Sequence, residues 1–290
     1  AYRADMSLAV GLFSQLTSRS LILAFQPVVT ASAAKQPVYW EVFLRRQTED
    51  SSFSEFSSAA KHIRAVERLG LIERVDRSVL WTVIGLLRRH PHVSLGCNVS
   101  AQSLKHGRWW HGFFDALQER PDLACRLIIE VTRTSAITED ADAIDILQGL
   151  QALGCKIAIS DMGLGYNTLD FVITSHPDYI KIDRGRLGAI SGETPESSLR
   201  LFGNLVRLCA DLTPCVVATG IEVERARTEA VATGVHALQG YLFGRPNVLP
   251  SWMGEVAVVR DAFEPDRSLN SAAATRDAQR KIFLASTRSE

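Results

Sequence analysis

The chain has 290 residues, 46% of them hydrophobic and 22% charged, a composition typical of a folded globular protein. Lysine and arginine together number 32, as do aspartate and glutamate, so the charge balance gives no indication of a nucleic-acid or membrane partner. No apolar run approaches the roughly 20 residues that span a bilayer, the start does not resemble a signal peptide, and five cysteines without a C-x-x-C spacing argue against a disulfide framework or a zinc site.

The first residues, 1–18, have the pattern of a helix with a polar lead-in. We interpret residues 1–20 as an N-terminal helix or as the end of a linker from an upstream domain. After them, short apolar runs alternate with longer amphipathic stretches. The runs predict strands at 21–29, 39–45, 93–100, 127–131, 156–162, 178–183, 215–221 and 237–243, and the stretches predict helices at 53–69, 72–89, 102–118, 141–153 and 198–212.

Several of these strands are almost continuously apolar, as at Leu127, Ile128 and Ile129, which is typical of strands buried on both faces. Eight such strands with helices between them predict an α/β fold, a (β/α)8 TIM-like barrel over residues 21–250. An open doubly wound sheet is the alternative. Only about nine residues join the first two strands, too few for a helical crossover, so the first strand should be antiparallel.

The end of the chain has a different pattern. Pro250 follows the last strand, residues 252–263 fit one more helix, and residues 268–290 are rich in serine, alanine, threonine and arginine. We therefore expect residues 251–290 to form a C-terminal helix and a flexible tail.

Polar side chains interrupt or end the apolar strands at positions that a barrel would bring to one mouth. Any one of them is more often a solvated strand terminus, but their recurrence on successive strands favours a shared site. An oxygen-rich site of this kind suits Mg²⁺, Mn²⁺ or Ca²⁺ better than zinc. The positions are Glu41, Asn98, Glu130, Asp161, Lys181, Asp183, Glu222 and Gln239.

The same positions resemble the motifs of the EAL domain family. Glu-Val-Phe-Leu-Arg at 41–45 resembles the segment that names the family, and Ser-Asp-Met-Gly at 160–163 resembles its Asp-Asp-Phe-Gly element. The other elements are the opening strand at 25–29, Asn-Val-Ser at 98–100, Glu-Val-Thr at 130–132, Lys-Ile-Asp at 181–183, Ala-Thr-Gly-Ile-Glu at 218–222 and the closing motif at 239–246. The resemblance runs from about residue 7 to residue 250, and it implies a (β/α)8 barrel with an antiparallel first strand.

The resemblance also implies two-metal hydrolysis of cyclic di-GMP to the linear dinucleotide. By position, the metal ligands would be Glu41, Asn98, Glu130 and Asp161. Lys181, which would contact the attacking water, and Asp161 would be the catalytic residues. The nucleotide would be bound by Gln26, Glu41, Leu44, Arg45, Asn98, Asp161, Lys181, Glu222 and Gln239, with the planar donors of Arg45 on a phosphate.

Three positions depart from the family pattern. Ser160 and Thr219 stand where the family has metal-site carboxylates, and a neutral hydroxyl is a poor ligand for a hard divalent cation. Arg133 stands where the family has a glutamate that braces a loop beside the metals. Two lost ligands and a reversed charge argue for severely weakened hydrolysis, which would leave Lys181 and Asp161 as vestiges and the metal site weak or vacant.

We therefore expect a cyclic di-GMP receptor or signalling module, for which binding needs no cofactor. The alternatives are a slow or conditional phosphodiesterase, which would need Mg²⁺ or Mn²⁺, and a protein-interaction scaffold that binds no nucleotide. The expected partners are cyclic di-GMP and either a protein partner or an upstream signalling domain, with a homodimer as a further option. Reduced thiols and the lack of an apolar span predict a cytoplasmic chain, or the soluble part of a larger protein, and the resemblance implies that the chain is bacterial.

Overall fold

Strand β1 (Leu21–Thr30) closes the sheet into a barrel because it hydrogen-bonds a neighbour on each side. The computed structural model describes residues 2–32, 36–47, 56–132, 140–163, 168–183 and 195–261. In it, β1 is antiparallel to β2 (Pro37–Gln47) and also antiparallel to β9 (Ala237–Gln239). The predicted barrel with an antiparallel first strand is therefore confirmed, and the open sheet is excluded.

The rest of the ring is parallel. From β2 it continues through β4 (Leu95–Ser100), β5 (Leu127–Thr132), β6 (Lys156–Ile159), β7 (Tyr179–Asp183) and β8 (Cys215–Thr219) to β9. One further short strand, β3 (Phe56–Ser58), pairs with the outer edge of β2 and is not part of the ring. Because neighbouring parallel strands point the same way, their C-terminal ends meet at one mouth.

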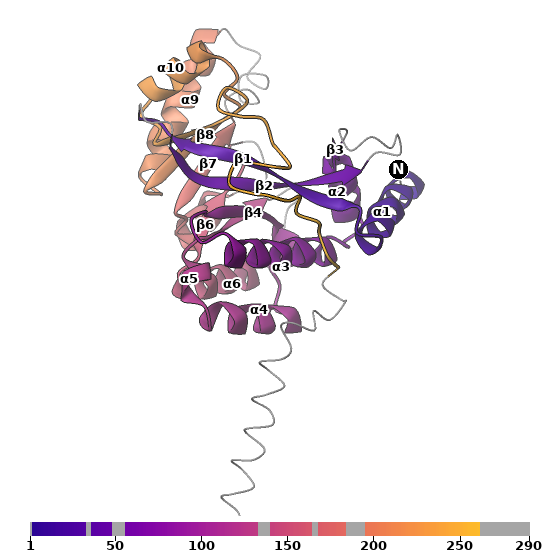
Figure 1. The fold of residues 1–290 in the computed structure, drawn as a ribbon. Coiled ribbons are helices and arrows are strands. Elements are labelled where there is room, and N and C mark those ends of the chain that lie inside the picture. The colour runs from indigo at the N-terminus through magenta and orange to yellow at the C-terminus, as the bar shows by residue number, and fades with distance from the viewer. Residues whose placement is uncertain are drawn as a thin grey trace, which may run out of the picture.

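Helices surround the strands, as Figure 1 shows, and their apolar faces form the larger core against the outer faces of the strands. In chain order they are α1 (Tyr2–Thr17), α2 (Ala60–Arg68), α3 (Glu73–Arg89), the 3₁₀ turn η1 (Ala101–Ser103), α4 (Arg108–Gln118), α5 (Pro121–Ala124), α6 (Asp140–Ala152), α7 (Leu169–Ser175), α9 (Pro195–Ala210) and α10 (Glu224–Ala232). Among the described residues, no helix is both long and apolar enough to cross a membrane.

Helix α1 packs beside α2 at one end of the barrel (Figure 1). It buries Ala9, Leu12 and Leu16, and an ion pair of 2.5 Å between Arg68 and Asp5 joins the two helices. The predicted N-terminal helix is confirmed. Its continuation into a linker stays a prediction.

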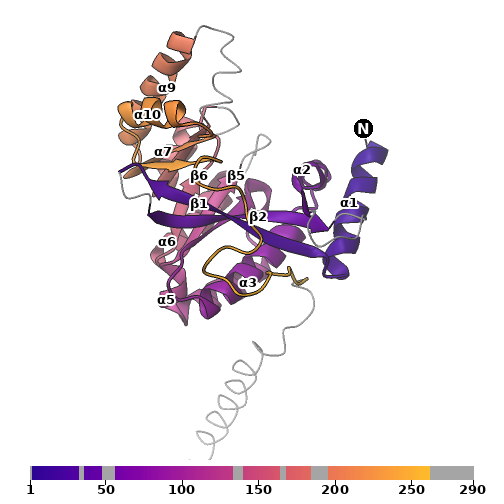
Figure 2. The same cartoon turned by 45° about the horizontal axis from the view of Figure 1, so that its top comes forward.

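The predicted helix at 252–263 is wrong for the part that the structure describes. Residues 247–261 form an irregular segment of turns and bends, which we call the C-terminal strap, beside β1 (Figure 2). Since β9 pairs only with residues 28–30, the rest of that β1 edge needs other partners, and the strap supplies them. Isolated bridges join Phe25 to Asn247 and Ile22 to Val258. Residues 262–290, including the expected tail, lie outside the described residues.

Other boundaries differ from the predictions for local reasons. The stretch predicted as a helix at 53–69 contains β3 and then α2, and α5, α7 and α10 were not predicted at all. The strands predicted at 156–162 and 237–243 end at Ile159 and Gln239. After the first, Asp161 adopts a positive φ of 55°, and after the second, Gly240 approaches Ile221 so closely that a Cβ would collide with its backbone.

Inside the ring, a layer of apolar and aromatic side chains fills the barrel. Its members are Val28, Tyr39, Ile128, Ala158, Tyr179, Val217 and Ala237, one from each strand except β4, which contributes the bare Gly96. We call this layer the floor, because it lies directly below the polar side chains at the mouth of the barrel.

Candidate functional site

A second layer lies directly above the floor and is almost entirely polar. Side chains two residues apart on a strand share a face, so each member follows a floor residue by two positions, or precedes it on the antiparallel β1. The layer, which we call the polar layer, consists of Gln26, Glu41, Asn98, Glu130, Ser160, Lys181, Thr219 and Gln239. The structure thus brings together eight positions that the sequence analysis singled out.

Lys181 is the centre of the polar layer. Its ammonium nitrogen lies 2.5 Å from Oε2 of Glu41 and 2.5 Å from Oε2 of Glu130. All three side chains are buried, with Glu130 completely inaccessible. One ammonium group therefore bridges two carboxylates that come from different strands.

Glu41 is bonded from further directions. Oε1 accepts a hydrogen bond of 2.8 Å from the amide of Asn98, and Oε2 accepts one of 2.7 Å from the amide of Gln239. Gln239 also lies 3.2 Å from Oε1 of Gln26, whose own amide donates to the carbonyl of Gly244 at 2.9 Å. Both oxygens of Glu41 are consequently occupied by N–H donors.

The charges of this cluster shift its titration. Burial and the neighbouring Glu41 raise the pKa of Glu130 to about 7, although the Lys181 ammonium acts in the opposite direction. Burial disfavours the charged form of Lys181, but the two glutamates outweigh that effect and raise its pKa. Lys181 therefore remains a cation, and it offsets the charge of one of the two carboxylates in the polar layer.

The sequence analysis missed two positions of the floor, Tyr39 and Gly96, which border the side chain of Glu130. The Tyr39 ring lies in the floor 5.3 Å from the ring of Tyr179. Among the described residues, neither its hydroxyl nor Oε1 of Glu130 has a hydrogen bond of standard geometry, although each group shifts the pKa of the other. The available signal was their spacing, since Tyr39 precedes Glu41 by two residues and Gly96 precedes Asn98 by two.

The remaining predicted residues lie at the rim or outside the mouth. Asp161 and Glu222 are exposed beyond the ends of their strands. Arg45 is half-buried, which lowers its pKa, and its guanidinium lies 5.5 Å from the centre of the Phe43 ring. Leu44 faces the other side of β2 and packs into the outer core.

The three departures lie in different places. Ser160 follows β6 and donates its backbone N–H to the carbonyl of Val131 at 3.1 Å. The Thr219 hydroxyl lies 3.5 Å from the carbonyl of Ile182 on the neighbouring strand. Arg133 lies outside the described residues.

The donor set fits a metal ion poorly. In the described ranges, no three histidine, cysteine, aspartate or glutamate side chains gather closely enough to hold one. A metal ion at Glu41 and Glu130 would have to displace the Lys181 ammonium from both carboxylates. The layer is arranged around an internal cation.

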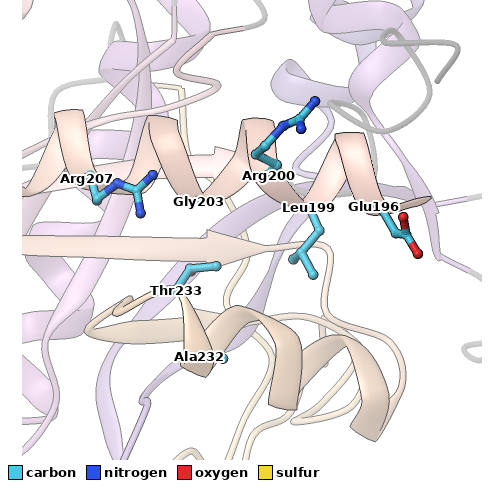
Figure 3. Close-up of a pocket in the computed structure, with 7 residues that line it drawn as sticks. All are labelled: Glu196, Leu199, Arg200, Gly203, Arg207, Ala232 and Thr233. Atoms are coloured by element: carbon cyan, nitrogen blue, oxygen red, sulfur yellow. The ribbon is translucent and has the colours of Figure 1, made fainter. Parts of the chain in front are cut away.

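A separate hollow lies on the outer helices, between α9 and the end of α10 (Figure 3). Glu196, Leu199, Arg200, Gly203 and Arg207 line it from α9, and Ala232 and Thr233 line it from the other side. None of these residues is on a barrel strand, so the hollow is distinct from the mouth.

Comparison with known proteins agrees with the fold. A family model described as the EAL domain matches residues 11–246. The cyclic di-GMP phosphodiesterase PdeF of Escherichia coli is 27% identical over 253 residues, 85% of this chain and 32% of that protein. The bifunctional diguanylate cyclase/cyclic di-GMP phosphodiesterase MucR of Pseudomonas aeruginosa is 28% identical over 248 residues, 83% of this chain and 35% of that protein. The chain thus spans about a third of the length of these curated relatives.

A solved structure of PaMucR phosphodiesterase, a complex with c-di-GMP, superposes with a TM-score of 0.65 at 27% identity. The superposition covers 79% of this chain and 97% of that one.

Proposed function

Because the chain belongs to the EAL domain family, we propose that it is a cyclic di-GMP-binding module whose hydrolytic activity is lost or severely weakened. The observation that carries the proposal is the Lys181 bridge, with 2.5 Å to each of Glu41 and Glu130. An ammonium group between two carboxylates already supplies positive charge where a metal ion would have to bind. Removing that ammonium from buried carboxylates costs free energy that a metal would first have to recover.

The two hydroxyls strengthen this argument. With carboxylates in place of Ser160 and Thr219, the polar layer would carry an excess of negative charge that only metal ions could offset. With hydroxyls there, the carboxylates that Lys181 bonds within the described ranges are those of Glu41 and Glu130. Metal loading is therefore less favourable, and hydrolysis by a two-metal mechanism is weakened with it.

Nucleotide binding follows different requirements. Cyclic di-GMP carries two phosphate charges, which a mouth of uncompensated carboxylates would repel. Lys181 offsets the charge of one of the two carboxylates, and Arg45 adds a half-buried guanidinium suited to phosphate. We propose that the dianion binds without a metal, with contacts from the positions Gln26, Glu41, Arg45, Asn98, Asp161, Lys181, Glu222 and Gln239. Leu44 is not among them, because its side chain packs into the outer core.

A slow or conditional phosphodiesterase is the second candidate. Glu41, Asn98, Glu130, Asp161 and Lys181 all retain the residue types of the family's hydrolytic site. If a metal ion displaces Lys181, Mg²⁺ or Mn²⁺ would be the expected cofactor.

The wider setting is also a proposal. We infer that the barrel acts in the bacterial cytoplasm, as part of a longer protein whose upstream domain, or a separate protein partner, transmits the signal. The short coverage of the curated relatives supports an additional domain.

The test is calorimetric titration of cyclic di-GMP into the protein, once with a chelator and once with Mg²⁺, followed by analysis of each mixture for the linear dinucleotide. We expect binding in both titrations and little or no product. Arg45→Ala should weaken binding by about 1.5–3 kcal/mol, roughly 10- to 150-fold, the range for a hydrogen bond to a charged group.

Arg225→Ala is the matched control, because Arg225 is an exposed arginine on α10. Its affinity should equal that of the unmodified protein. Absence of binding at high micromolar nucleotide would favour the scaffold without nucleotide, and rapid product formation would favour the phosphodiesterase.

A further inference from the structure

Tyr39 and Glu130 come from strands that are not neighbours, yet their side chains meet. Tyr39 is on β2 and Glu130 is on β5, with β4 between them in the sheet. On β4 the intervening position is Gly96, which is paired in register with Glu41 on one side and Ile128 on the other. A Cβ at position 96 would overlap Oε1 of Glu130 and would lie 2.6 Å from Cε2 of Tyr39. The missing side chain of Gly96 therefore makes the space in which the other two meet.

Oε1 of Glu130 and the edge of the Tyr39 ring border this space. The hydroxyl of Tyr39 is a donor and Oε1 of Glu130 is an acceptor, and both are buried. Among the described residues neither atom has a hydrogen bond of standard geometry, but the two groups are close enough to shift each other's pKa. Each buried polar atom left without a hydrogen bond costs roughly 1–3 kcal/mol. The other carboxylate oxygens of the cluster have donors, namely Asn98 and Gln239 on Glu41 and Lys181 on both glutamates.

We propose that the Tyr39 hydroxyl donates a hydrogen bond to Oε1 of Glu130 and is thereby a positioning residue for that carboxylate. The bond fixes which oxygen of Glu130 points down into the barrel and which points up to Lys181 and the mouth. A tyrosine hydroxyl ordinarily keeps its proton up to about pH 10, so it has the proton that it donates. With this bond, every carboxylate oxygen in the polar layer has a donor from the protein itself.

The test compares Tyr39→Phe with the unmodified protein in the absence of nucleotide, so its outcome is independent of whether the mouth binds cyclic di-GMP. Phenylalanine keeps the ring in the space beside Gly96 and removes only the hydroxyl. If the hydroxyl bonds Glu130, the folding equilibrium constant of the variant should fall by up to about 10-fold, as measured by urea unfolding. In a Glu130→Gln background the same change should cost less than about 3-fold, because the charged acceptor is gone.

A spectroscopic readout separates positioning from packing. In protein labelled with ¹³C-glutamate, Tyr39→Phe should shift one carboxylate stretching band in the infrared spectrum. Tyr179→Phe, which changes the neighbouring ring of the same floor layer, should leave that band unmoved. A Tyr39→Phe protein that is as stable as the unmodified one or more stable, with unshifted carboxylate bands, would overturn the proposal.

Discussion

Ser160 and Thr219 each contribute a short neutral hydroxyl to a ring of side chains that otherwise reaches toward the barrel axis. Ser160 is two residues after Ala158, and Thr219 is two residues after Val217, so both belong to the polar layer by strand periodicity. Their positions make them direct neighbours of β7, which carries Lys181. These two residues are the natural points at which to change the charge of the site.

Restoring both carboxylates should raise hydrolysis. Ser160→Asp with Thr219→Glu should turn over cyclic di-GMP well above the unmodified protein when Mg²⁺ or Mn²⁺ is supplied, measured by release of the linear dinucleotide. Either change alone should do much less, because ligands that act as a unit are not additive. Arg133→Glu belongs in the series, since the reversed charge can still limit the double variant.

Thr228→Glu is the control for added charge, because Thr228 lies on α10 away from the polar layer. It should leave the rate unchanged. Turnover by the unmodified protein at about 1 per second or faster, a rate ordinary for enzymes, would contradict our interpretation of Ser160 and Thr219.

Single residues of the site could be predicted from the sequence, but the bonds between them could not. Glu41, Asn98, Glu130 and Lys181 stand out because each polar residue interrupts an apolar run. Which of them touch depends on strand register and side-chain length, and Lys181 reaches Glu41 across 140 positions of sequence. Tyr39 was not predicted as a site residue because an aromatic residue in a strand is ordinary. Its contact with Glu130 depends on Gly96, which has no side chain between them.

At the scale of elements, α3 is joined to the end of β4 by a buried carboxylate. Oδ2 of Asp76, in the first turn of α3, accepts hydrogen bonds from the backbone N–H of Ser100 at 2.9 Å and from the hydroxyl of Ser103 at 2.6 Å. Ser100 is two residues after Asn98. Asp76 therefore holds in place the strand end that carries one amide of the polar layer.

The stability of this link should depend on pH. Burial raises the pKa of Asp76 to about 7, from an ordinary value of 3.8. Between these pH values the unfolded chain binds fewer protons at this carboxyl than the folded chain does, so the group lowers the free energy of unfolding as pH rises, and the effect levels off above about pH 7. Replacement by asparagine removes the contribution, whose slope is at most about 1.4 kcal/mol per pH unit.

Urea unfolding at several pH values between 5 and 8 measures this. The free energy of unfolding of the unmodified protein minus that of Asp76→Asn should decrease as pH rises to 7. Asp211→Asn, at an exposed aspartate, should give a difference without that slope. A flat difference for Asp76→Asn as well would show that its carboxyl titrates normally in the folded protein.

Elements were predictable where their pattern was long and local. Helix α3 and strands β1 and β5 follow directly from amphipathic or apolar runs, whereas α7 and α10 are only 7 and 9 residues long and give weak periodicity. Residues 252–261 were wrongly predicted as part of a helix because their conformation is imposed by β1, more than two hundred positions earlier in the chain. A local pattern carries no information about such a partner.

At the scale of the whole molecule, both ends of the described chain are fixed against the same region. Helix α1 hydrogen-bonds β2 through Gln15 and Arg46 at 2.7 Å, and the strap ends with an ion pair between Asp261 and Arg74 on α3. Along the way, the N–H of Leu23 donates to Ala257 at 2.9 Å and the N–H of Val259 donates to Leu21 at 2.8 Å. The barrel is thus closed by β9 at one end of β1 and by the strap along the rest.

This closure means that the boundaries of the family match are not the boundaries of a stable molecule. A chain cut to residues 11–246 would lose the strap and expose the outer edge of β1, a row of unpaired N–H and C=O groups on an apolar strand. Such an edge pairs readily with another copy, so the shortened protein should self-associate, visible as concentration-dependent growth in light scattering. A chain of residues 11–261, which keeps the strap, should form a particle whose size is independent of concentration. If the shortened protein stays monodisperse, the strap is not needed to keep the edge of β1 from pairing with another copy.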